Sequence, residues 1–123
     1  MSSIRIALAN IRIPSSREES VVLATAAIAE AGRQRASIVC FPECYVPGYR
    51  WPGVTMPPPD AAFLERAWRD VAEAARAAAI TVILGTERIT ERGLQISAAV
   101  FNADGSLAGF QDKTQLDPSE EAT

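Results

Sequence analysis

The sequence predicts an α/β protein whose elements follow the order β-α-β-α-β-β-β. Short apolar runs of strand length alternate with two longer segments in which apolar residues recur every three or four positions. The final third instead holds strand-like runs joined by the turn Asn102–Gly105. Strands that alternate with helices favour parallel pairing with right-handed crossovers, and a short turn between strands favours an antiparallel hairpin that extends the sheet.

The first strand is expected over residues 4–10, where large apolar side chains stand at every second position. The first helix is expected from about residue 18 to residue 33, because its apolar residues fall on one helical face. A serine that precedes a glutamate by three positions can cap the start of this helix in either of two ways: Ser15 with Glu18, or Ser16 with Glu19.

The second strand is expected over residues 37–41, an apolar run that suits a buried parallel strand. Pro42 has no N–H to donate and ends the strand, so Glu43 stands just beyond its carboxyl end. A loop with five prolines follows over residues 44–60. Loops of this length are often functional, and a proline-stiffened surface cover is the alternative that the sequence leaves open.

Asp60 is a suitable N-cap for a second helix, which is expected over residues 61–79. The third strand is expected over residues 80–86, the fourth over about 94–102 and the fifth over 106–112. The fourth and fifth strands should form the hairpin.

Composition excludes several classes of function. The net charge of −3 lacks the basic character of a nucleic-acid binder. The apolar runs are too short to span a membrane, and the chain starts without the features of a signal peptide, so we expect a cytoplasmic protein with reduced cysteines. The absence of histidine excludes His-based triads and HExxH zinc sites, and two cysteines alone are a poor zinc site, so no metal is expected.

Glu43 and Lys113 are the candidate chemical pair, since each follows the carboxyl end of a strand, where sites in open α/β sheets form. Burial between the apolar Phe41-Pro42 pair and the aromatic loop would suit Glu43 to general base chemistry. Lys113 is the single lysine, and it could hold that carboxylate or stabilise a developing oxyanion. A surface ion pair is the alternative that the spacing leaves open.

Two motifs resemble the nitrilase superfamily of carbon–nitrogen hydrolases. Residues 41–43, Phe-Pro-Glu, followed by Gly48-Tyr49, resemble its glutamate motif, and residues 112–116, Asp-Lys-Thr-Gln-Leu, resemble its lysine motif. The resemblance implies a four-layer α-β-β-α sandwich, of which residues 1–123 would be the N-terminal half. It also implies a Glu-Lys-Cys triad without metal or organic cofactor, in which Glu43 is the general base and Lys113 stabilises the tetrahedral intermediate.

The resemblance further implies the substrate and the assembly. A nitrile or a small amide would be hydrolysed through a cysteine thioester, with Tyr49 and Trp51 lining the acyl pocket. Glu120 or Glu121 could match a second glutamate of the family, and the sequence does not choose between them. Members of the family often dimerise, so a homo-oligomer is expected.

The family's nucleophilic cysteine follows a later strand and has no counterpart in residues 1–123. Cys40 lies in an apolar strand, and the carboxylate of Glu43 disfavours a thiolate at Cys44. We therefore expect an incomplete, inactive part of a hydrolase domain that exposes an apolar sheet face and self-associates. The alternative is a stand-alone, non-catalytic α/β binding or regulatory module. A flavodoxin-like domain lacks support, because no Gly-rich phosphate loop follows the first strand.

Overall fold

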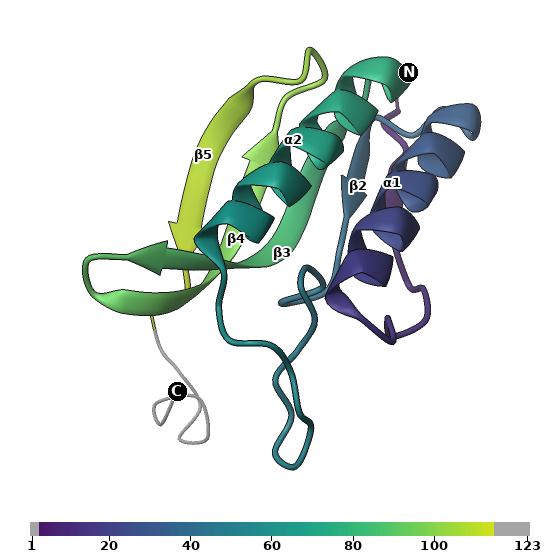
Figure 1. The fold of residues 1–123 in the computed structure, drawn as a ribbon. Coiled ribbons are helices and arrows are strands. Elements are labelled where there is room, and N and C mark those ends of the chain that lie inside the picture. Colours follow the sequence, from purple (N-terminus) through teal and green to yellow (C-terminus); the bar gives the residue numbers. More distant parts are fainter. Residues whose placement is uncertain (1–2, 115–123) are drawn as a thin grey trace.

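The computed structural model describes residues 3–114, which form one five-stranded sheet with two helices side by side on one of its faces (Figure 1). The predicted element order is confirmed. Glu120 and Glu121 lie outside the described residues. The elements are β1 (Ile6–Leu8), α1 (Arg17–Arg33), β2 (Ile38–Cys40), α2 (Ala61–Ala78), β3 (Thr81–Thr90), β4 (Gly93–Phe101) and β5 (Leu107–Asp112).

The strands stand in the sheet in the order in which they occur in the chain. β1, β2 and β3 are parallel, and β4 and β5 each pair antiparallel with the strand before them. β5 therefore runs in the same direction as β2. The predicted hairpin of β4 and β5 is confirmed.

The lengths of β1 and β3 differ most from the prediction. β1 is shorter than residues 4–10, because only Ile6–Leu8 pair with β2. β3 continues four residues beyond the predicted end at residue 86, because it forms a second hairpin in which Thr90 pairs with Gly93. This extension carries Glu87 and Arg88, two charged residues that take part in the contacts described below.

Side-chain caps fix the starts of both helices. Ser16 is the N-cap of α1 and accepts a hydrogen bond from the backbone N–H of Glu19, which decides between the two predicted boxes. The Glu19 carboxylate reaches back to the N–H of Ser15, one residue earlier than in the standard capping box. Asp60 caps α2 as predicted, accepting from the N–H of Phe63 at 3.1 Å.

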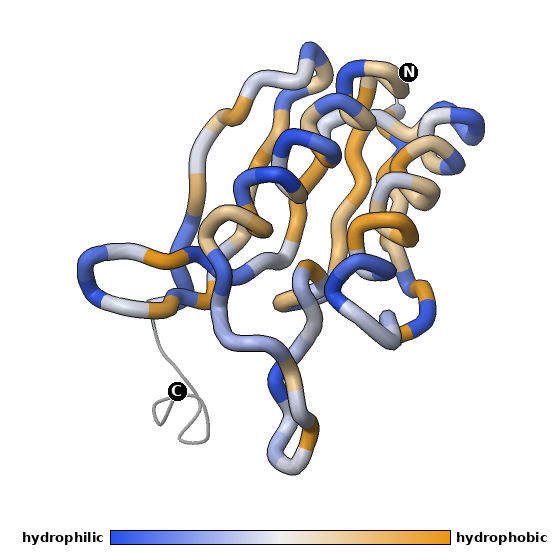
Figure 2. The backbone as a smooth tube through the Cα atoms, viewed as in Figure 1, coloured by the Kyte–Doolittle hydropathy of each residue, from blue (hydrophilic) through white to orange (hydrophobic). Residues whose placement is uncertain are grey.

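The core lies between the helices and the sheet, where apolar residues follow the strands behind the helices (Figure 2). Ile28 of α1 and Leu64 of α2 are fully buried there, as are Val82 and Leu84 of β3. The helices approach each other closely at Gly32, where a Cβ atom would lie only 2.8 Å from the Cβ of Ala78.

The opposite face of the sheet is apolar and uncovered at its β1 edge. Ile6 and Leu8 are exposed, Leu8 by 76%. Their register places them beside Ile38 and Cys40 of β2, so the apolar surface continues into the sheet. The exposed apolar face that the sequence predicts is therefore observed. Neither helix of the described chain combines the length and apolar character that a membrane span requires.

Candidate active site

Glu43 and Lys113 meet, although 70 residues separate them in sequence. The Nζ atom of Lys113 donates a hydrogen bond to Oε1 of Glu43 at 3.0 Å. The contact forms because β2 and β5 run in the same direction, so the residues that follow them reach the same edge of the sheet. The expectation that the two residues share one rim is confirmed.

The burial predicted for Glu43 is wrong for the described chain. The side chains are 41% exposed for Glu43 and 33% exposed for Lys113. Phe41 does turn into the core, but Pro42 and Glu43 point outward, because a run of apolar neighbours does not fix the face on which the next residue lies. Residues 3–114 therefore supply a hydrogen-bonded charge pair that is open to solvent.

A short excursion of the backbone carries Glu43 out of the line of β2. The N–H of Phe41 donates to Ile83 at 2.9 Å, and the N–H of Val46 donates to Gly85 at 3.2 Å. Between these two hydrogen bonds the chain that carries Glu43 advances by five residues, from 41 to 46, whereas β3 advances by only two, from 83 to 85. Cys44 takes up the turn in the left-handed conformation, with φ of 52°.

Gly85 makes this excursion possible, and its positioning role was not predicted. A Cβ atom at position 85 would lie 1.9 Å from the carbonyl oxygen of Pro42 and 2.9 Å from the nitrogen of Cys44. Only glycine lets the backbone on both sides of Glu43 rest directly on β3. The available signal was a glycine inside an otherwise apolar strand, which typically marks a close backbone approach.

The backbone N–H of Lys113 donates a hydrogen bond to the carbonyl oxygen of Ile96 at 2.7 Å. The preceding residue, Asp112, is fixed by an ion pair with Arg88. Arg88 of β3 donates to Oδ2 of Asp112 at 2.9 Å, and its guanidinium lies 4.6 Å from the centre of the Phe110 ring. Among the described residues, Oδ1 of Asp112 is buried without a hydrogen-bond partner. Arg88 fixes the end of β5 from across β4, a contact that the sequence pattern does not reveal.

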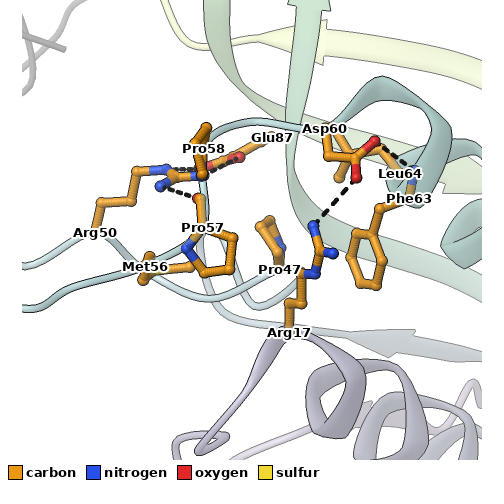
Figure 3. Close-up of a pocket in the computed structure, with 10 residues that line it drawn as sticks. All are labelled: Arg17, Pro47, Arg50, Met56, Pro57, Pro58, Asp60, Phe63, Leu64 and Glu87. Carbon is orange, nitrogen blue, oxygen red and sulfur yellow. Dashed lines mark hydrogen bonds and ion pairs between the residues drawn. The ribbon is translucent and has the colours of Figure 1, made fainter.

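The proline-rich loop brings Tyr49 and Trp51 together, with ring centres 4.7 Å apart. Trp51 remains 52% exposed. The neighbouring pocket in Figure 3 is lined by other residues, among them Arg50 and Glu87, which are joined by an ion pair. The acyl-pocket role of Tyr49 and Trp51 stays a prediction.

The two cysteines are not arranged as nucleophiles or metal ligands in the described chain. Cys44 is 4% exposed and Cys40 is half-buried, and neither forms a disulfide. Within residues 3–114 no group of three or more Cys, Asp or Glu side chains could hold a metal ion.

The whole length of this fold matches one family of enzymes. The model of the carbon-nitrogen hydrolase family matches residues 5–123. The chain belongs to the carbon–nitrogen hydrolases. It is 31% identical over 118 residues to the omega-amidase of Mus musculus, covering 94% of this chain and 42% of that protein. It is 28% identical over 100 residues to a nitrilase of Penicillium rubens, covering 72% of this chain and 30% of that one.

Solved structures of carbon–nitrogen hydrolases share the fold. An amidase from Nesterenkonia sp. superposes with a TM-score of 0.79 at 25% identity, over 98% of this chain and 47% of the amidase. A carbon–nitrogen hydrolase from Helicobacter pylori superposes with a TM-score of 0.78 at 18% identity, over 94% of this chain and 41% of that protein. The chain thus spans less than half the length of the relatives that it matches.

Proposed function

We propose that residues 1–123 form the N-terminal part of an amidase- or nitrilase-type hydrolase, with Glu43 as general base and Lys113 as oxyanion stabiliser. The observation that carries the proposal is the 3.0 Å contact between Lys113 Nζ and Glu43 Oε1 at the carboxyl edge of the sheet. The nucleophilic cysteine would come from a later part of the protein, because Cys44 is buried and Cys40 lies within β2.

The substrate would be a nitrile or a small amide. The matched relatives are an omega-amidase and a nitrilase, and structures of the Nesterenkonia amidase hold acrylamide and butyramide. In the amide reaction the Glu43 carboxylate takes the thiol proton while sulfur bonds to the carbonyl carbon, and the carbonyl electron pair moves to oxygen. Lys113 donates a hydrogen bond to that oxyanion.

The intermediate then collapses and expels ammonia, which receives the proton held by Glu43, and an acyl thioester remains. Water gives a proton to Glu43 as it attacks the thioester carbon. Collapse of the second tetrahedral intermediate then releases the carboxylic acid and a thiolate, which takes the proton back from Glu43 and restores the thiol. Closure of the site by the rest of the protein would exclude the solvent that now reaches Glu43 and Lys113. The hydrogen bond between them and the one from Lys113 to the oxyanion would then be stronger.

The test is to assay purified residues 1–123 and the complete gene product against small amides and nitriles. We expect turnover from the complete product alone, abolished by Glu43→Gln and by replacement of a cysteine beyond residue 123. Turnover by residues 1–123 that Cys44→Ser abolishes would contradict the proposal. A native protein with an intact mass near 13.2 kDa and no turnover would favour the binding or regulatory module instead.

A further inference from the structure

Glu87 is a buried carboxylate that the proposed reaction does not use. Its side chain is only 3% exposed. Both of its oxygens accept from one guanidinium, Arg50 Nε to Oε1 at 2.5 Å and Arg50 Nη2 to Oε2 at 3.2 Å. Taking a carboxylate out of water is costly unless such a forked partner meets it, so this pair is a built feature of the fold.

Arg50 also ties the two arms of the proline-rich loop together. Its Nη1 donates to the carbonyl oxygen of Pro57 at 2.8 Å, on the arm that returns toward α2. Figure 3 shows the guanidinium of Arg50 lying between Pro57 and Glu87. One side chain therefore joins the outgoing arm, the returning arm and β3.

Arg50 is the central residue of a three-residue turn, closed by a hydrogen bond from the N–H of Trp51 to the carbonyl of Tyr49 at 3.1 Å. The rings of the two flanking residues contact each other, with their centres 4.7 Å apart. Because the guanidinium is fixed by Glu87 and Pro57, the turn and the two aromatic side chains are fixed with it.

The charges around this loop are balanced. Arg50 is paired with Glu87, and Arg17, the other cation of the pocket in Figure 3, is paired with Asp60 at 3.3 Å. Trp51 is 52% exposed, so the aromatic pair presents apolar surface next to Arg50, a cation whose charge is already compensated by Glu87. Such a surface favours an uncharged alkyl or aryl group over a group that carries a carboxylate.

We propose that Arg50 and Glu87 are positioning residues that hold Tyr49 and Trp51 as an aromatic wall for an uncharged, apolar acyl group. The positioning itself is a property of the described chain. Its meaning for substrate choice rests on the proposed hydrolase function. The two parts can be tested separately.

The first test measures the loop in residues 1–123. Amide hydrogen exchange across residues 48–56 should quicken about tenfold in Arg50→Gln and Glu87→Gln, less in Arg50→Lys, and not in the exposed control Arg92→Gln. The indole N–H resonance of Trp51 should shift, while that of Trp68, which donates to Thr86 at 3.1 Å, stays in place. If Arg50→Gln does not fold, the neutral double variant Arg50→Gln/Glu87→Gln carries the test. Unchanged exchange and an unchanged Trp51 resonance in the folded variants would overturn the positioning role.

The second test measures substrate choice in the complete, active protein. Wild type should prefer butyramide to acetamide by about fourfold in kcat/KM for each added methylene, and should discriminate against an amide whose acyl chain ends in a carboxylate. Arg50→Gln should lose the alkyl preference through a higher KM for butyramide, Arg50→Lys should keep part of it, and the exposed control Arg92→Gln should keep all of it. A preference for the carboxylate-bearing amide would overturn the apolar wall. Absence of turnover in wild type would instead contradict the proposed function, and the loop measurements would be unaffected.

Discussion

Replacement of Gly85 by alanine should displace Glu43, the proposed general base, because the added Cβ atom would clash with the backbone of the two residues beside it. The added Cβ atom would lie 1.9 Å from the Pro42 carbonyl oxygen, whereas real Cβ contacts are essentially never under 3.0 Å. The Pro42–Cys44 backbone must therefore move away from β3 by about 1 Å, since the neighbouring atoms are backbone rather than a flexible side-chain end.

The displacement has two consequences whose sizes follow from the structure. It strains or breaks the hydrogen bonds from Val46 to Gly85 at 3.2 Å and from Tyr45 to Pro42 at 3.3 Å. With about 1 kcal/mol for each of the two lost bonds and about 1–3 kcal/mol for the overpacked contact, Gly85→Ala should lower the free energy of unfolding by about 3–5 kcal/mol. The contact between Glu43 and Lys113 should lengthen from 3.0 Å beyond hydrogen-bonding distance.

The assay is urea unfolding of residues 1–123, together with the turnover of the complete protein, where a misplacement of about 1 Å should lower the rate about hundredfold. Gly109→Ala is the control for an added Cβ atom without a clash, because nothing lies within 4 Å of that position. Its φ of 155° disfavours an L side chain, so this variant should cost about 1 kcal/mol through backbone strain alone. A Gly85→Ala protein with the stability and turnover of wild type would refute the close-approach argument.

Four further predictions concern the charge pair, the helix start, acid stability and the open sheet face. Lys113→Ala should change the free energy of unfolding by less than about 1 kcal/mol, because the pair is partly exposed. It should lower the proposed turnover of the complete protein at least about hundredfold. A large loss of stability with unchanged turnover would favour a structural ion pair. Ser16→Ala should destabilise α1 by about 1 kcal/mol in urea unfolding, through loss of its N-cap. The side-chain hydrogen bond from Arg12, together with the backbone N–H of Ser15, lowers the pKa of Glu19 from 4.5 to about 2. The contribution of ionised Glu19 to the free energy of unfolding should therefore be complete above pH 4.5 and be lost as the pH falls toward 2. Glu19→Gln should remove this pH dependence from urea unfolding measured between about pH 5 and pH 2. Residues 1–123 should self-associate in light scattering, and Leu8→Lys should reduce the association because it places a charge on the exposed apolar face.

The sequence was sufficient for features that depend on periodicity and chain direction. Apolar spacing predicted both helices, and the contact of Glu43 with Lys113 followed from the rule that residues after parallel strands share an edge. The choice of Ser16 over Ser15 as N-cap required coordinates, because both boxes have the same spacing.

Contacts between backbone segments and between distant charges leave no periodic trace. Gly85 is required because it has no Cβ atom, which lets the Pro42 backbone pack against β3. Arg50 pairs with Glu87, which lies 37 residues away in the sequence. The outward direction of Glu43 depends on the left-handed turn at Cys44, which the residue type gives no reason to expect. The missing physical information in each case is the three-dimensional proximity of segments whose local sequences are unremarkable.

The strand order has a consequence for synthesis of the protein. Within residues 3–114 every strand after β1 pairs with the strand that precedes it in the chain, so none of the described strands has to be inserted between two earlier ones. As the chain leaves the ribosome, each new strand can add to a growing edge. Glu43 and Lys113 can therefore come into contact once β5 and Lys113 have emerged, before any later segment of the protein has folded.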